Sequence, residues 1–185
     1  MSEEIAMNGD DLATVLKAAW FASDKHRSQR RKDVDASPYI NHPLALAHVL
    51  ATEGGISDAV VIAAALLHDT VEDTETTQEE LVCEFGTAIA AFVAEVTDDK
   101  TLEKAERKRL QVVQSSTKSH GAKLVKLADK ICNLRDIAAS PPADWNSDRR
   151  RQYFAWAADV VEGIRGTSES LEAAFDEAYG ARSRL

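Results

Sequence analysis

The stretch Val60–Leu67 (VVIAAALL), followed at once by HDTVED at residues 68–73, decides how this chain is interpreted. Its eight apolar residues predict a helix that is buried nearly all round. The run that follows brings one imidazole and three carboxylates to the end of that helix. At helical spacing, the histidine and the first aspartate lie one turn before the glutamate and the last aspartate. Ionisable groups in such a place cost free energy unless a partner neutralises them, so the stretch indicates a site for a divalent metal ion.

The composition points to an all-α protein. The chain has 185 residues, of which 44% are hydrophobic and 29% charged, while glycine (8) and proline (4) are few. A chain of this length forms one ordinary domain with a substantial core. Its net charge of −9 argues against a surface that coats nucleic acid. A phosphate ligand would therefore need a local basic pocket.

Several features predict a cytoplasmic protein that binds no membrane. No apolar run approaches the roughly 18 residues of a membrane span. The start, Met-Ser-Glu-Glu, lacks the basic residues of a signal peptide. Cys83 and Cys132 fall within expected helices and show no metal-finger spacing, so we expect both to be reduced thiols in the core.

Helical periodicity runs through nearly the whole chain, with no strand, repeat or linker apparent. Ser57 is the expected N-cap of the helix that contains VVIAAALL, with Asp58 in its first turn. Thr77-Gln-Glu-Glu80 is a capping-box pattern, and Gly86 is expected to end a short helix. The helices are expected at 10–28, 44–53, 57–73, 77–86, 87–96, 103–114, 122–138, 146–166 and 168–178, with loops at 29–41 and 118–121.

Three separated segments offer metal ligands. They supply His42, the adjacent His68 and Asp69, and Asp129, which shares a helix face with Asn133 and Asp136. Two imidazoles and two carboxylates make a mixed nitrogen and oxygen site that suits Mn²⁺, Fe²⁺, Co²⁺ or Zn²⁺. Each residue alone has a simpler explanation, since a histidine before a proline often caps a helix and an aspartate between lysines often forms a surface ion pair. Together with the apolar helix, they favour a metal site.

Five blocks, in order, carry a resemblance to a known family. The blocks are HRSQRRK (26–32), PYINHP (38–43), ALLHDTVEDT (65–74), EVTDDKTL (95–102) and KLVKLADKICNLRD (123–136). With them the chain resembles the HD-domain hydrolases of the RelA/SpoT group, and within it the small stand-alone alarmone hydrolases similar to the metazoan SpoT homologue. One departure is mild: Cys132 stands where the long bifunctional relatives usually have histidine.

The resemblance implies an HD-domain helical bundle, in which residues 1–185 form a single domain with a motif-bearing core at about 10–175. It also implies a metal ion, usually Mn²⁺, held by His42, His68, Asp69 and Asp129. The pair that follows, Glu72 and Asp73, is implied to be catalytic.

Substrate-binding residues follow less directly. The resemblance associates Arg31, Lys32 and Asn133 with the substrate. To these we add Tyr39, which could stack on a base or ribose or simply pack. We also add Lys104, with Lys100 nearby, although both could be ordinary solvated lysines.

The function implied is metal-dependent hydrolysis of guanosine 3′,5′-bis(diphosphate), ppGpp or pppGpp, at the 3′-pyrophosphate, giving GDP or GTP and pyrophosphate. An alternative uses the same site as an NADPH 2′-phosphatase or another nucleotide phosphohydrolase. A third hypothesis, a non-catalytic alarmone-binding module, is disfavoured because every expected ligand and catalytic position is present. The partner expected is thus a small nucleotide, with no nucleic acid or membrane involved, and the oligomeric state is left open, with a homodimer possible.

Overall fold

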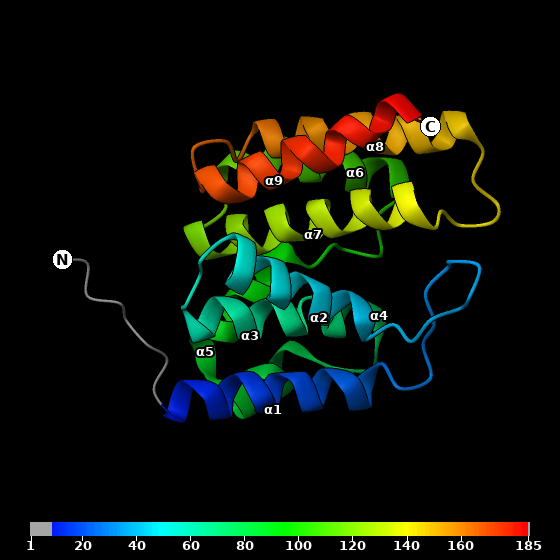
Figure 1. The fold of residues 1–185 in the computed structure, drawn as a ribbon. Coiled ribbons are helices and arrows are strands. Elements are labelled where there is room, and N and C mark those ends of the chain that lie inside the picture. Colours follow the sequence, from blue (N-terminus) through cyan, green and yellow to red (C-terminus); the bar gives the residue numbers. More distant parts are fainter. Residues whose placement is uncertain (1–8, 185) are drawn as a thin grey trace.

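The computed structural model describes residues 9–184, and this part of the chain folds as a bundle of helices (Figure 1). Among these residues β structure is confined to one isolated bridge between Arg30 and Pro38, so the all-α prediction is confirmed. The elements are α1 (Gly9–Lys25), α2 (Asn41–His48), η1 (Val49–Glu53), α3 (Ala59–Leu67), α4 (Thr70–Asp73), α5 (Gln78–Val96), α6 (Lys104–Gln114), η2 (Ser115–Thr117), α7 (His120–Ala139), α8 (Ser147–Glu162), α9 (Glu169–Gly180) and η3 (Ala181–Arg184).

Helix α3 lies at the centre of the bundle. Eight of its nine residues are buried, because α1, α2, α5 and α7 all pack against it. In Figure 1 the helices form layers, with α1 on one side of α2 and α3, and α7 on the other. An apolar helix without a polar face is stable only when it is covered in this way.

The expected helix 57–73 differs from the structure at both ends. Asp58, rather than Ser57, is the N-cap, because its carboxylate accepts from the amide of Val60 at 2.8 Å. The helix also ends at Leu67, and the short helix α4 begins only at Thr70. The Thr70 hydroxyl donates to the Leu67 carbonyl at 2.7 Å, so a side chain takes the place of a backbone partner where the chain turns.

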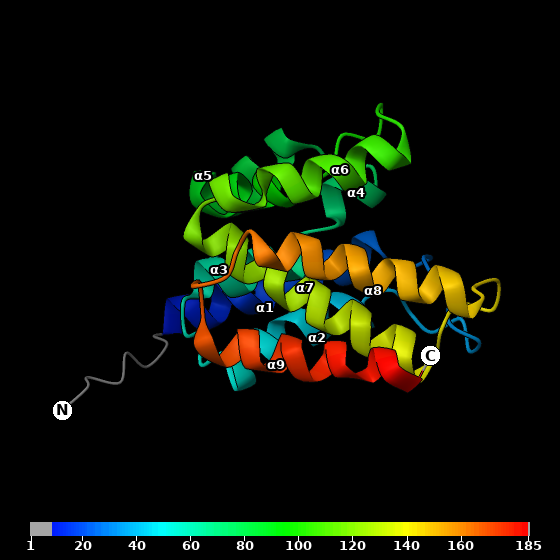
Figure 2. The ribbon, with the colours of Figure 1, turned by 90° about the horizontal axis from the view of Figure 1, so that it is seen from above.

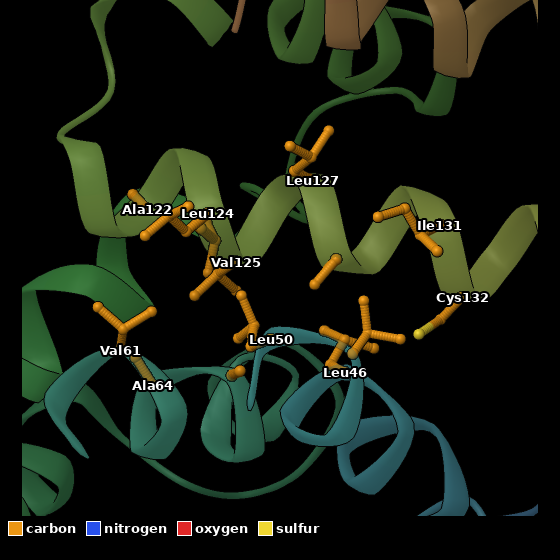
Figure 3. Packing of buried hydrophobic residues seen from close by; sticks show 14 of the residues in the cluster. Leu46, Leu50, Val61, Ala64, Ala122, Leu124, Val125, Leu127, Ile131 and Cys132 are labelled. Carbon is orange, nitrogen blue, oxygen red and sulfur yellow. The ribbon is translucent and has the colours of Figure 1, made fainter. Parts of the chain in front are cut away.

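Helix α7 packs both against earlier helices of the chain and against the two helices that follow it. It contacts α2, η1 and α3 on one side and α8 and α9 on the other, and Figure 2 shows it running between α8 and α9. Figure 3 shows Val125 of α7 facing Leu50, Val61 and Ala64 across the core. Because this helix is held on both sides, residues on its inner face have well-defined positions relative to α2 and α3.

The structure corrects two smaller expectations and agrees with a third. Helix α7 begins at His120 with Ser119 as its N-cap, so the expected loop 118–121 is shorter. Gly86 lies at a kink inside α5, with φ at +81°, and so separates two helical segments as expected. Of the two free cysteines, Cys132 is buried but Cys83 is exposed, so the expectation of a core thiol was wrong for Cys83.

The second half of the expected helix 44–53 is a π-helical turn, η1, which is tied to α7 by a bidentate ion pair. Arg135 donates to the two carboxylate oxygens of Glu53 at 2.6 and 2.8 Å. This hydrogen bonding holds the pKa of Glu53 below its ordinary value. The pair joins segments far apart in the sequence, although about a third of each side chain remains exposed.

We expect Glu53→Gln to lower the free energy of unfolding by about 0.5–1 kcal/mol at pH 7, as for a well-oriented surface pair. Because the folded-state pKa is depressed, this stability is present above the unfolded pKa of about 4.3 and is lost as the pH falls through the folded value. Urea unfolding at pH 7 and near pH 3.5 checks this. A difference that persists at the lower pH would mean that packing, rather than charge, is lost.

The loops that follow α1 and α7 project from the same end of the bundle (Figure 1). Among residues 9–184, no helix combines the length and the apolar composition that a membrane crossing requires.

Candidate active site

The turn between α3 and α4 presents His68 and Asp69. The Nδ1 atom of His68 is 2.8 Å from the carbonyl of Ala65, which assigns the proton to Nδ1 and leaves Nε2 free to act as a ligand. This Nε2 atom lies 2.9 Å from Oδ2 of Asp69. The break in the helix therefore brings the two side chains together, instead of leaving them pointing about 100° apart.

His42, in the first turn of α2, completes a buried group of three ligands. One ligand atom from each of His42, His68 and Asp69 lies within 4.8 Å of the others, and the two imidazole centroids are 5.3 Å apart. Nδ1 of His42 is buried and has no hydrogen-bond partner in the structure. Two imidazoles and a carboxylate that converge in a buried place fit a divalent transition metal.

Asp129 reaches the same place from α7. Its Oδ1 atom lies 3.4 Å from Nε2 of His42 and accepts from the side-chain amide of Asn133 at 2.5 Å. Its Oδ2 atom accepts from Lys130 at 2.9 Å. With only 8% of the residue exposed, Asp129 is not the surface ion-pair residue that its lysine neighbours had suggested. Its carboxylate stands next to the group of three as a fourth candidate ligand and a second source of oxygen.

The ionisation of these residues suits metal binding. Burial lowers the pKa of His42, which keeps its imidazole neutral. Burial alone would raise the pKa of Asp69, but the imidazole of His68 holds that pKa well below its ordinary value. Burial would likewise raise the pKa of Asp129, and the adjacent Lys130 holds it well below the ordinary range. Both carboxylates are thus anionic ligands at neutral pH.

Glu72 and Asp73 lie in α4, directly after the group of ligands. One carboxylate oxygen of Glu72 accepts from the amide of Asp98 at 3.2 Å, and the other is 3.7 Å from Arg107. Burial raises the pKa of Glu72. The more exposed Asp73 accepts a hydrogen bond from Lys100, which places that lysine near the site. A half-buried carboxylate with a raised pKa is suited to accept a proton.

A cavity of about 630 Å³ opens beside these residues, between the loops after α1 and α7. Its lining includes several of the residues expected from the sequence: Arg31, Lys32, Tyr39, His42, Asp73 and Asn133. Lys104 is exposed on the first turn of α6 and is not among the lining residues of this cavity. The structure thus brings Arg31, Lys32, Tyr39 and Asn133 together at this cavity, whereas neither Lys104 nor Lys100 is among its lining residues.

The structure adds residues that the sequence did not single out. Trp145 and Tyr153 form an aromatic wall on the α8 side of the cavity, with their ring centroids 5.6 Å apart. Asp136, expected only to share a face with Asp129, accepts from Arg31 at 2.6 Å. An aromatic residue after a Pro-Pro turn or inside a helix carries no signal of a ligand site, so the wall was not predictable.

Tyr39 makes a hydrogen bond that the sequence did not predict. Its hydroxyl donates to Oδ2 of Asp69 and lies 3.4 Å from Oδ2 of Asp73. Burial and the carboxylate of Asp69 raise the pKa of Tyr39, so the hydroxyl remains a donor.

Comparison with known proteins finds relatives over almost the whole chain. A family model described as the HD domain matches residues 18–157. The guanosine-3′,5′-bis(diphosphate) 3′-pyrophosphohydrolase MESH1 of Homo sapiens is 55% identical over 174 residues, which cover 94% of this chain and 97% of that protein. The GTP pyrophosphokinase rsh of Brucella melitensis is 38% identical over 160 residues, which are 83% of this chain but only 20% of that protein.

A solved structure is similar over the same extent. It is described as a metazoan ortholog of SpoT that hydrolyzes ppGpp and plays a role in starvation responses. It superimposes with a TM-score of 0.89 at 47% sequence identity and covers 94% of this chain and 97% of its own.

Proposed function

Because the chain belongs to the HD domain family, we propose that it hydrolyses guanosine 3′,5′-bis(diphosphate) at the 3′-pyrophosphate, giving GDP and pyrophosphate. The observation that carries this proposal is the position of the His42, His68 and Asp69 group at the edge of a cavity that also contains Arg31 and Lys32. Relatives whose names state this reaction, similar over nearly the full chain, support it.

The cavity suits a polyphosphorylated nucleotide. Its volume of about 630 Å³ lies within the usual range of small-molecule sites. The planar guanidinium group of Arg31 and the ammonium group of Lys32 can bind phosphates. They provide the local positive charge that a protein with net charge −9 needs to bind an anionic substrate. Trp145 and Tyr153, which also line the cavity, offer a surface for a purine base.

We assign the cofactor as Mn²⁺, with other divalent transition metals as alternatives. His42, His68 and Asp69, joined by Asp129, would hold it. When bound, such an ion supplies Lewis acidity that polarises a phosphoryl oxygen and makes water more nucleophilic at neutral pH. The neutral imidazole of His42 and the ionised carboxylates of Asp69 and Asp129 are protonation states that this ion requires.

The protein's own residues can carry the proton transfer. Water attacks the phosphorus atom attached to O3′, the bond between that phosphorus and O3′ breaks, and pyrophosphate receives the new oxygen. Glu72 accepts one proton of the water, a role that its raised pKa favours. The departing O3′ takes up a proton from solvent, which restores the 3′-hydroxyl of the nucleotide. Arg31 and Lys32 hold the phosphates, and Lys100 keeps Asp73 in place beside them.

Two further assignments belong to this proposal. Both cysteines are free, which supports a cytoplasmic enzyme. We also propose that residues 1–185 act as one catalytic domain, since MESH1 of Homo sapiens and the solved structure each align over 97% of their own length.

The test is product analysis by ion-exchange chromatography after the Mn²⁺-loaded protein is incubated with ppGpp. We expect equal amounts of GDP and pyrophosphate from the wild type and none from His68→Ala. The matched control is His48→Ala, because His48 is exposed on α2, and this variant keeps wild-type activity. Intact ppGpp with the wild type, together with release of phosphate from NADPH, would overturn the proposal in favour of the 2′-phosphatase.

A further inference from the structure

Tyr39 connects a candidate metal ligand to a candidate catalytic carboxylate. Its hydroxyl donates to Oδ2 of Asp69 and is 3.4 Å from Oδ2 of Asp73. These two acceptors come from the α3–α4 turn and from α4, whereas Tyr39 comes from the loop before α2. The hydroxyl therefore fixes one segment against the other at the place where the ligands converge.

The ring of Tyr39 is already packed by side chains. The imidazole of His26 lies 4.8 Å from it, centroid to centroid, with the planes 32° apart. The guanidinium carbon of Arg31 is 5.7 Å from the ring centroid. His26 is itself 2% exposed and is held by Gln29 at 2.6 Å. A ring enclosed in this way belongs to the wall of the site and is poorly placed to stack on a nucleobase.

The carboxylate of Asp69 needs a hydrogen-bond partner from another segment to fix its orientation. It lies in the turn between two helices, and Oδ2 faces His68 at 2.9 Å as well as Tyr39. A carboxylate at such a turn has rotational freedom about its side-chain bonds, and a hydrogen bond from another segment restricts that freedom. Partners that orient metal ligands typically change metal affinity by roughly 10- to 100-fold when they are lost.

We propose that Tyr39 is a positioning residue: its hydroxyl orients the carboxylate of Asp69 for the metal ion, and it does not bind the nucleobase. This rests on the proposed function only in taking Asp69 as a metal ligand. The ring of Tyr39 has a separate role, since it packs against Arg31 and His26. Removal of the hydroxyl alone therefore separates the two roles.

The experiment is a calorimetric titration of metal-free Tyr39→Phe protein with Mn²⁺, without nucleotide. We expect the dissociation constant for Mn²⁺ to rise by roughly 10- to 100-fold. The midpoint of thermal unfolding of the metal-free protein and the KM for ppGpp at saturating Mn²⁺ should stay at wild-type values. At limiting Mn²⁺, kcat should fall, and added Mn²⁺ should restore it.

The matched control is Tyr179→Phe, which removes a tyrosine hydroxyl on α9 that accepts from Arg182 at 2.8 Å. This variant should bind Mn²⁺ like the wild type. An unchanged Mn²⁺ affinity in Tyr39→Phe, or a raised KM with that affinity intact, would overturn the inference. If the wild type binds Mn²⁺ and Tyr39→Phe weakens it while neither hydrolyses ppGpp, the proposed function fails and this inference stands.

Discussion

Glu72→Gln is expected to reduce kcat for ppGpp hydrolysis by roughly 100- to 10,000-fold, the usual contribution of a general base. Glutamine keeps the shape of the side chain and can still accept from the amide of Asp98, which is 3.2 Å from the carboxylate in the wild type. It cannot accept a proton from water at neutral pH. Binding of Mn²⁺ should be nearly unchanged, because Glu72 is outside the group formed by His42, His68 and Asp69.

The dependence of kcat/KM on pH separates this role from a structural one. Burial raises the pKa of Glu72, so in the wild type kcat/KM should fall with decreasing pH in a range above the ordinary glutamate value of about 4.3. In Glu72→Gln this acidic limb should be absent, because no carboxylate remains there to be protonated. Release of pyrophosphate, followed between pH 4.5 and 9, measures both.

Glu75→Gln is the control, since Glu75 is an exposed carboxylate just after α4. It should retain the activity and the acidic limb of the wild type. If Glu72→Gln kept wild-type kcat while Asp73→Asn lost activity, the base would be Asp73 and the assignment of Glu72 would be wrong.

The main elements of the fold were predictable because their signals are local. VVIAAALL has no polar face, and only a central, fully covered helix satisfies it, as α3 shows. Caps such as Thr77, which accepts from the amide of Glu80 at 3.1 Å, also follow from neighbouring residues. The break after Leu67 was missed, because periodicity does not reveal that the hydroxyl of Thr70 will take the carbonyl of Leu67.

The candidate metal ligands could be listed from the sequence, but their geometry could not be predicted. His42, His68 and Asp69 come from two segments that the sequence could only list, and the packing of α2 on α3 brings them together. The contacts that organise the site join distant positions, as in the pairs Tyr39 with Asp69 and Arg31 with Asp136. No spacing rule connects residues 30 or 105 positions apart, so these contacts appear only in the structure.

The burial of charged residues at the site was also not predictable from the sequence. Lysine next to aspartate in a helical sequence is typical of an exposed ion pair, and the sequence alone therefore suggests an exposed pair for Asp129 and Lys130. The structure buries both residues, because the face of α7 that carries them turns toward α2 and α8. A buried cation in contact with a candidate metal ligand is expected to affect both stability and metal binding, and that coupling leads to a further prediction.

Lys130→Met is expected to lower the stability of the metal-free protein by about 3–5 kcal/mol, the cost of leaving a buried charge without its partner. Lys130 is 2% exposed, donates to Asp129 at 2.9 Å and to Gln111 at 3.2 Å, and lies 4.3 Å from the centroid of the Trp156 ring. Methionine keeps most of the apolar stem. For a domain of this size, the midpoint of thermal unfolding should fall by roughly 10 °C.

Mn²⁺ should reverse much of this loss. Without Lys130, Asp129 loses its strongest cationic neighbour and keeps the weaker attraction of Lys126. A divalent cation near Asp129 then no longer meets the repulsion of the Lys130 ammonium group. Binding to the folded state alone raises the unfolding temperature. We therefore expect saturating Mn²⁺ to raise the unfolding midpoint of Lys130→Met more than that of the wild type, as measured by calorimetry with and without the ion.

Lys123→Met is the matched control, because Lys123 lies on the same helix but is partly exposed, and its loss should change stability by no more than about 0.5 kcal/mol. Equal gains from Mn²⁺ in Lys130→Met and in the wild type would contradict the placement of Asp129 among the ligands. A large loss of stability with a larger gain from Mn²⁺ would indicate that the ion and the ammonium group both act on the carboxylate of Asp129, so that a single buried aspartate links folding to metal binding.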